Sequence, residues 1–221
     1  MAIIQEGTVL AGIRGKIGKV VIYPWKSKVC ARSTPAKPRK KAVRTVKQQA
    51  QSNKMKVLSS FLNAVNPFLQ VGFKQKVKDQ DLSANNAAKS VNMKHAIKGE
   101  FPEQEINWDT ILVADGDLIK PENVVVKVSK NTFNFTWDED KTGQASPNDR
   151  TMILLYNKEY QHFFANYSGA RRDELKDTLC LDSSPIRTKG RTYEVFIVFK
   201  DIMSDEVSKS VYCGSFENQF I

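Results

Sequence analysis

The spacing of apolar residues changes near Ile106, and this change divides the chain into a helical part and a strand part. Between Thr45 and Ile106, apolar residues recur every three or four positions, which is the period of an amphipathic helix. After it, they alternate with polar residues in short runs, which is the period of a half-buried strand. In the run Thr192–Phe199 both faces are apolar, which predicts a central strand.

Seven runs in the second part have the length and alternation of strands, with polar turns between them. Seven short strands over about a hundred residues are typical of an immunoglobulin-like antiparallel β-sandwich. Trp137 and Tyr193 occupy places that are typical of a fibronectin type III core, although many sandwiches share them. The expected strands are Val124–Ser129, Thr132–Trp137, Met152–Tyr156, Gln161–Ala165, Thr178–Asp182, Thr192–Phe199 and Glu206–Cys213.

Two main helices are expected in the first part of the chain. Thr45, followed three residues later by Gln48, fits a capping box, so the first helix should begin near Thr45. Pro67 should end or kink this helix. The second should run over Ser83–Lys98 and end at Gly99. One face of the second helix is apolar and carries Ala84, Ala87, Ala88 and Val91.

A basic β-hairpin is expected before these helices. Gly12–Trp25 has the pattern of a glycine-punctuated strand, residues 26–28 of a turn, and Val29–Arg32 of a return strand. The prolines and charges of Pro35–Lys41 favour an extended connector. The whole chain is therefore predicted to be an α+β protein, with hairpin and helices in residues 1–105 and an immunoglobulin-like sandwich in residues 106–221.

Charge is distributed unevenly along the chain. From Gly7 to Lys78 there is no acid against seventeen Lys and Arg, and residues 1–100 carry a net +16 while residues 101–221 carry −6. The density is highest between Arg14 and Lys47, where Tyr23 and Trp25 are interleaved. The candidate polyanion-binding residues of this segment are Arg14, Lys16, Lys19, Tyr23, Trp25, Lys26, Lys28, Arg32, Lys37, Arg39, Lys40, Lys41, Arg44 and Lys47.

Three interpretations of this basic segment stay open. Lys and Arg bind phosphate backbones by releasing condensed counterions, and aromatic rings stack on bases, so the first is a non-enzymatic nucleic-acid or polyanion binder. In the second, the segment meets an acidic protein surface, as in a self-assembling, virion-like subunit whose two halves attract each other. In the third, it is a solvated face, although a face needed only for solubility would tolerate mixed charges.

The glycines at Gly12, Gly15 and Gly18 are spaced every third residue. Such glycines cradle phosphate in some RNA-binding folds, but the spacing fits neither a Walker motif nor a dinucleotide fingerprint. Glycines that let a strand bend or approach another backbone are the favoured interpretation.

The chain resembles an uncharacterised domain family of Bacteroidetes over nearly its full length. The residues that carry the resemblance are Gly15–Val21 with Trp25-Lys26 and Arg32-Ser33, then Thr45 with Gln48-Gln49, Ala96–Pro102 and Val211–Ser215. The resemblance implies a bacterial or phage-associated origin and a basic N-terminal half joined to a β-sandwich. It implies no activity and supplies no catalytic residues.

An acidic loop has part of a calcium-loop pattern. Asp138, Asp140, Thr142 and Asp149 stand at positions 1, 3, 5 and 12, and Gly143 at position 6. The twelfth position is Asp rather than the longer Glu, and strands rather than helices are expected on both sides. A plain acidic loop between strands is therefore favoured over a metal site.

No catalytic arrangement is recognisable in the sequence. His95 shares the apolar face of its helix and is expected to pack in a core, while His162 lies in a candidate strand. The neighbouring acids of Glu139-Asp140 and Asp173-Glu174 show no spacing that demands acid–base chemistry. We therefore expect no enzymatic activity, cofactor, metal or small-molecule substrate.

The three cysteines, Cys30, Cys180 and Cys213, are far apart and form no Cys-x-x-Cys motif. Cys180 and Cys213 are expected to pack as small apolar residues in strands. With no signal peptide and no apolar run of membrane-spanning length, a cytoplasmic location is expected.

Overall fold

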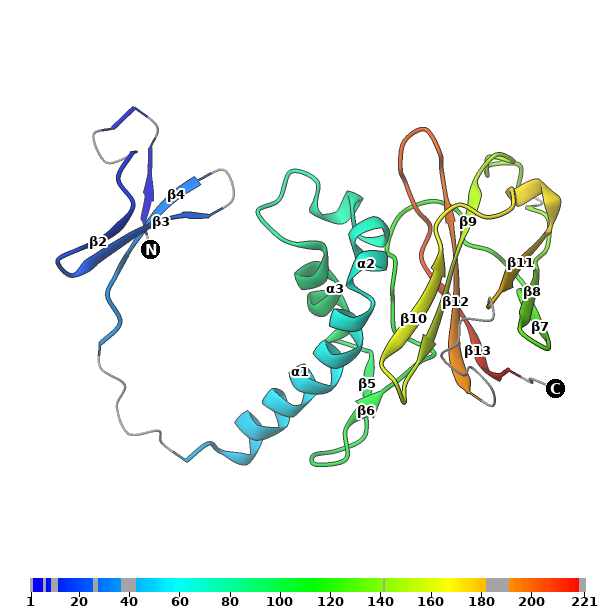
Figure 1. Ribbon diagram of the computed structural model, residues 1–221, viewed down its shortest axis with the longest axis horizontal. Helices are drawn as coiled ribbons and strands as arrows, with labels where there is room; N and C mark the ends of the chain where they lie inside the picture. The colour runs from blue at the N-terminus through cyan, green and yellow to red at the C-terminus, as the bar shows by residue number, and fades with distance from the viewer. Residues whose placement is uncertain are drawn as a thin grey trace. The chain divides into compact units, whose positions relative to one another are not determined.

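The computed structural model describes residues 2–5, 7–8, 12–25, 28–36, 43–140, 142–181 and 191–218 (Figure 1). Residue contacts divide the chain into two compact units, Met1–Thr45 and Val46–Ile221. The division lies well before the boundary that we expected between residues 105 and 106. It does so because the helices share an apolar core with the strands of the second unit.

The first unit is an antiparallel sheet of four strands in the order β1-β4-β3-β2. These strands are β1 (Ala2–Ile4), β2 (Gly15–Ile17), β3 (Val20–Trp25) and β4 (Lys28–Ser33). The expected hairpin is the β3–β4 pair, in which Trp25 lies opposite Lys28. The single strand expected over Gly12–Trp25 is wrong, because the chain turns back between Ile17 and Val20. Gly18, with φ at 58°, supplies the left-handed conformation of this tight turn.

The second unit begins with helices, as the periodicity predicted. The helical elements are α1 (Val46–Ala64), α2 (Asn66–Gly72), the short 3-10 helix η1 (Gln75–Val77) and α3 (Ala84–Asn92). Pro67 lies in the first turn of α2, where its missing N–H costs no hydrogen bond. Ser83 caps α3 by accepting a hydrogen bond from the Asn86 backbone N–H at 3.2 Å.

The second predicted helix is shorter than expected, since α3 ends at Asn92 and not near Lys98. The Asn92 side chain is fully buried and holds the backbone of Leu112 by two hydrogen bonds of 2.8 Å. The chain then turns, and β5 (Ile97–Lys98) pairs with β6 (Glu105–Ile106). A tertiary contact therefore replaces the last helical turns.

All seven strands expected after residue 106 are present, with shifted ends. They are β7 (Val125–Ser129), β8 (Thr132–Thr136), β9 (Arg150–Asn157), β10 (His162–Asn166), β11 (Lys176–Cys180), β12 (Thr192–Lys200) and β13 (Val211–Glu217), with a second 3-10 helix, η2 (Arg172–Glu174), before β11. They form one sheet in the order β10-β9-β12-β13 and another in the order β11-β8-β7. The last predicted strand starts late, because Val207 and Ser208 form only isolated bridges to Lys200 and Leu118.

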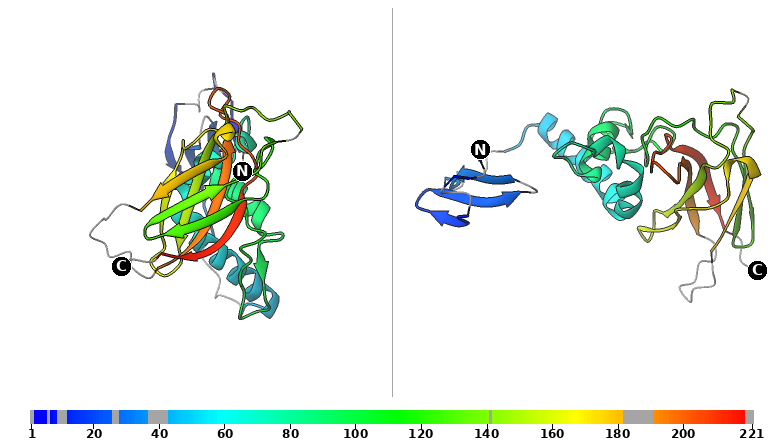
Figure 2. Two further views of the ribbon diagram at one scale, coloured as in Figure 1. Left: turned by 90° about the vertical axis from the view of Figure 1, so that its right-hand side faces the viewer. Right: turned by 90° about the horizontal axis from the view of Figure 1, so that it is seen from above.

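The four-stranded sheet of the second unit is covered on both sides. Val195, Ile197 and Phe199 of β12 pack with Phe133 and Phe135 of the three-stranded sheet, and other side chains of β12 pack against the helices. Figures 1 and 2 show the helices on one side of this sheet and β7, β8 and β11 on the other. The prediction that 192–199 forms a central strand with two apolar faces is confirmed.

Candidate polyanion-binding surface

One face of the small N-terminal sheet carries basic and aromatic side chains together. Lys16 lies opposite Val21, which in turn lies opposite Arg32, and Trp25 lies opposite Lys28. Side chains of paired residues point to the same side of a sheet, and every second residue along a strand does so as well. Lys16, Tyr23, Trp25, Lys28 and Arg32 therefore share one face, which we call the basic face.

The side chains of the basic face are accessible to a ligand. Lys16 and Arg32 are exposed, and the Trp25 side chain is 43% exposed. The Arg32 guanidinium lies 5.5 Å from the centre of the Tyr23 ring, where cation–π attraction orients it. A guanidinium on an aromatic ring keeps its planar fork of N–H donors, so Arg32 can still bind a phosphate at two points.

The other predicted basic residues lie around this sheet or outside the described part of the chain. Arg14 precedes β2, Lys19 lies in the β2–β3 turn, and Arg44 lies near the end of the first unit; all three are exposed. Lys47 is in the first turn of α1 and so belongs to the second unit. The remaining predictions lie outside the described residues, namely Lys26, Lys37, Arg39, Lys40 and Lys41.

The glycines near β2 match the conformational interpretation. Gly15 and Gly18 have φ angles of 111° and 58°, which residues with a side chain rarely adopt. A Cβ atom at Gly12, Gly15 or Gly18 would meet no other atom within 4 Å. Backbone conformation, rather than close packing, therefore explains glycine at positions 15 and 18.

The first unit carries the whole net charge of the protein. Residues 1–45 contain eleven Lys and Arg against one acid, Glu6, which gives +10. Residues 46–221 contain 23 basic and 23 acidic residues, so the second unit has no net charge. The excess of basic residues that the sequence shows over residues 1–100 therefore belongs mainly to the first unit.

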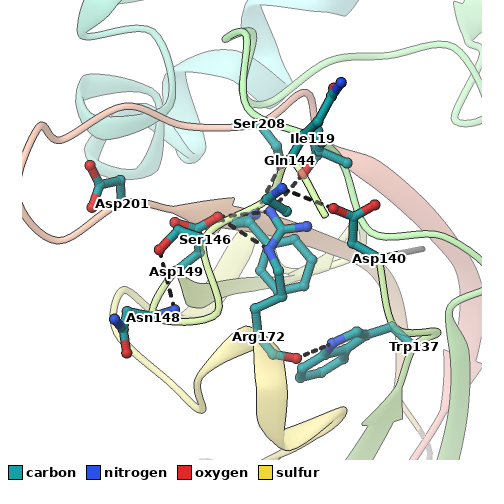
Figure 3. A network of polar contacts seen from close by, with 12 residues as sticks. Ile119, Trp137, Asp140, Gln144, Ser146, Asn148, Asp149, Arg172, Asp201 and Ser208 are labelled. Atoms are coloured by element: carbon teal, nitrogen blue, oxygen red, sulfur yellow. Dashed lines mark hydrogen bonds and ion pairs between the residues drawn. The ribbon is translucent and has the colours of Figure 1, made fainter. Parts of the chain in front are cut away.

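In the acidic loop with the partial calcium pattern, the carboxylates accept hydrogen bonds from groups of the protein itself (Figure 3). Asp140 accepts hydrogen bonds from the Thr142 hydroxyl, the Ala145 N–H and the Thr142 N–H, which together lower the pKa of Asp140 to about 2. Asp138 accepts a hydrogen bond from Asn123 at 2.7 Å. Within the described ranges, no three His, Cys, Asp or Glu side chains gather as a metal site would require.

Asp149, the last residue of that pattern, is buried and paired with Arg172. Arg172 also donates to the Ile119 carbonyl at 2.7 Å, and its guanidinium lies 3.8 Å from the centre of the Phe199 ring. Trp137 Nε1 donates to the Arg172 carbonyl at 2.9 Å. The pair therefore connects the loop and η2 with β12 and with Trp137 after β8. Sequence reasoning missed it, because no local pattern links residues that lie 23 positions apart.

The histidines and acid pairs form no catalytic arrangement in the described part of the chain. His95 is exposed in the turn after α3, so the prediction of a core histidine is wrong. It fails because α3 ends at Asn92. His162 is exposed on β10. Asp173 and Glu174 form exposed ion pairs with Arg171, at 3.2 and 3.7 Å.

The three cysteines are free, and they differ in burial. Cys30 is buried in β4, and Cys213 packs against the apolar core between the two sheets, where burial raises the pKa of its thiol to about 12. The apolar packing predicted for Cys213 is confirmed. Cys180 is exposed at the end of β11, so the same prediction is wrong for Cys180.

A cavity of about 260 Å³, lined in part by aromatic side chains, lies between α1 and β9. The face of its Trp108 ring is already occupied by the side chain of Lys158. The cavity is lined by Phe61, Trp108 and Tyr156 among others. Lys158 Nζ lies 4.8 Å from the centre of the Trp108 ring and 2.5 Å from the buried Glu194 carboxylate. This closed set of contacts favours a structural role.

The chain belongs to a family of unknown function. The model of the family described as "Family of unknown function (DUF6266)" matches residues 12–214. The match therefore includes β2 to β4 of the first unit and most of the second unit. No curated protein matches the chain. None of the described helices is both long enough and apolar enough to cross a bilayer.

Proposed function

We propose that this member of a family of unknown function is a non-enzymatic binding protein whose basic face engages nucleic acid or a similar polyanion. The observation that carries the proposal is the register of the small sheet. It gathers Lys16, Tyr23, Trp25, Lys28 and Arg32 on one side of a unit with a net charge of +10.

Charge and stacking would act together on this face. Each phosphate neutralised by Lys or Arg releases counterions, so binding should weaken steeply as salt rises. If Lys16, Lys28 and Arg32 each meet one phosphate, the logarithm of the affinity for a single strand should fall with a slope of about −2 against log salt. Trp25 offers a ring on which an unpaired base can stack, which favours single-stranded over duplex ligands.

The acid-free stretch continues into the second unit. Helix α1 has no Asp or Glu over its nineteen residues and carries Lys47, Lys54 and Lys56. Its buried side chains, Leu58, Phe61 and Leu62, all lie in its second half. The part of α1 that precedes Leu58 is therefore a further basic element that a long polyanion can contact.

Fluorescence anisotropy with a labelled oligonucleotide would test the proposal. The double variant Lys16→Glu/Arg32→Glu should lose most of its affinity and flatten the salt dependence. The matched control is Lys120→Glu/Lys127→Glu, which makes the same change in charge at two exposed lysines of the second unit. Equal losses in both variants, or no binding by the native protein at about 50 mM salt, would overturn the proposal.

A self-assembling structural subunit is the second candidate. Two acid-lined cavities of about 210 and 350 Å³ adjoin at Asp117, one with Asp115 and Glu206 and the other with Asp149 and Asp201. Asp115 and Asp149 are buried and paired with Lys76 and Arg172. The accessible acids, Asp117, Asp201 and Glu206, offer a surface for the basic unit of another copy. Light scattering would test this: assembly by opposite charges should weaken as salt rises, and a strict monomer at low salt and high concentration would exclude it.

For the two packed sheets, we propose a fibronectin type III-like sandwich. The seven strands are divided into the orders β7-β8-β11 and β10-β9-β12-β13, and buried Trp137 and Tyr193 lie between the sheets. The fourth strand supports this type over a constant immunoglobulin domain: β10 pairs with β9, whereas the fourth strand of a constant immunoglobulin domain joins the other sheet. Cross-strand NMR contacts between β10 and β11 in place of β9 would contradict this proposal.

A further inference from the structure

The opposite face of the small sheet carries no charged residue. It consists of the residues that alternate with those of the basic face, and we call it the uncharged face. Its members are Ala2, Ile4, Gly15, Ile17, Val20, Ile22, Pro24, Val29, Ala31 and Ser33. Every Lys and Arg within the four strands therefore lies on the basic face, and the two faces differ completely in charge.

Large apolar side chains of the uncharged face are open to solvent. Ile17 is 51% exposed and Val20 is 41% exposed, side by side on the paired strands β2 and β3. Among the described residues of the first unit, only Ile22 and Cys30 are buried apolar residues. A unit of 45 residues with so small a core normally gains its stability from a further partner, and oligomerisation is a common source.

The segregation of charge indicates which partner covers this face. A polyanion is drawn to the basic face and gains nothing from covering apolar side chains. Two copies of the unit, both strongly basic, can approach each other only where neither carries charge, and the uncharged face is that surface. Packed sheets lie ~10 Å apart, which already exceeds a Debye length of about 8 Å at physiological salt. The basic faces, on the outer sides, are farther apart still, so their repulsion is largely screened.

We propose that the protein forms a dimer in which the uncharged faces of two N-terminal units pack against each other. The same patch serves both copies, as in a two-fold symmetric interface. The two basic faces then point outward in opposite directions. Where the proposed polyanion binding also holds, the dimer presents two binding faces, and a long polyanion gains avidity from the second. The dimer itself does not depend on that function.

Light scattering on the full chain, without nucleic acid, would test the dimer. Native protein should show a dimer mass that persists or grows as salt rises, because salt screens the like charges of the two copies. Assembly through opposite charges would show the reverse dependence. A native protein that stays monomeric at high concentration and high salt would overturn the proposal, and so would an oligomer that salt dissociates.

Two matched variants locate the interface. Val20→Asp should raise the dimer dissociation constant roughly tenfold or more, because each copy would bury an unpaired carboxylate. Ile3→Asp makes the same kind of change at a side chain that is 59% exposed on the basic face, and it should leave the dimer intact. Equal effects of the two variants would contradict the assignment of the face.

A milder substitution distinguishes a weakened interface from an unfolded unit. Ile17→Thr keeps a β-branched residue suited to a strand while removing apolar surface, so it should weaken the dimer and leave the circular dichroism spectrum unchanged. The polyanion variant Lys16→Glu/Arg32→Glu should remain dimeric, which separates failure of this inference from failure of the proposed function. An unchanged dimer in Ile17→Thr would overturn the interface.

Discussion

The Nη2 atom of Arg172 lies 2.9 Å from Oδ2 of Asp149, and both side chains are more than nine-tenths buried. Arg172 Nε contacts the same oxygen at 3.1 Å. Burial raises the pKa of the Asp149 carboxyl, and the charge of Arg172 opposes that rise. Such a pair is costly to bury, but it is much more costly to break, because a single remaining charge has no partner.

Removal of the arginine should therefore destabilise the second unit strongly. We expect Arg172→Ala to lower its free energy of unfolding by about 3–5 kcal/mol. The neighbouring Arg171→Ala provides the control, since its side chain is 45% exposed and its ion pairs should be worth about 0–1 kcal/mol. Urea denaturation followed by tryptophan fluorescence would measure both. Similar losses for the two variants would show that the buried pair has no special role.

The end of α3 depends on one buried amide. Asn92 donates to the Ala88 carbonyl at 3.0 Å and exchanges two hydrogen bonds of 2.8 Å with Leu112. Asn92→Ala should cost about 1–3 kcal/mol, because the Leu112 backbone groups lose their partners in a partly buried place. Asn86→Ala, at an exposed position of the same helix, should change stability by only about 0.5 kcal/mol. Thermal unfolding would measure the loss of stability in both variants. A larger loss of stability for Asn86→Ala than for Asn92→Ala would contradict the role given to Asn92.

Sequence patterns gave the element types well because those depend on local periodicity. The alternation in 192–199 reflects real burial on both sides, Ser83 starts α3, and the first helix ends before Pro67, as predicted. Pro67 itself lies in the first turn of α2. Failures occurred where a distant contact decides the local structure. Asn92 ends α3 through Leu112, 20 residues away, and this shifts His95 out of the helix.

The candidate surface was predictable in composition but not in geometry. The charge count singled out the segment that contains Lys16 and Arg32, with Tyr23 and Trp25 interleaved. Residues two apart in one strand, such as Tyr23 and Trp25, lie on one side of it. The place of Lys16 on that side depends on the turn at Gly18, whereas the glycine-punctuated pattern predicted one continuous strand there. The three-residue strands β1 and β2 are too short to show alternation by themselves.

Low pH should weaken the contact that Asp205 makes with two lysines. Hydrogen bonds and the charges of Lys200, at 2.7 Å, and Lys74, at 2.6 Å, lower the pKa of Asp205 from 3.8 to about 2. A lowered folded-state pKa contributes stability that is present above about 3.8 and is lost as the pH falls through about 2. The free energies of unfolding of native protein and Asp205→Asn should therefore differ near neutral pH and converge in acid. A difference that stays constant with pH would contradict this.

Trp25 should matter most for unpaired bases. We expect Trp25→Ala to weaken binding of a single-stranded oligonucleotide by about 1–3 kcal/mol, the usual value of one stacked base, and to affect a duplex of the same length much less. The control is Tyr160→Ala, which removes an aromatic ring that is 53% exposed in the second unit. Anisotropy titrations at one fixed salt concentration would compare the three proteins. Because Trp25 carries no charge, the slope of affinity against salt should be the same for Trp25→Ala and native protein. A changed slope, or an equal loss on single strands and duplex, would mean that Trp25 positions the basic side chains and does not stack on a base.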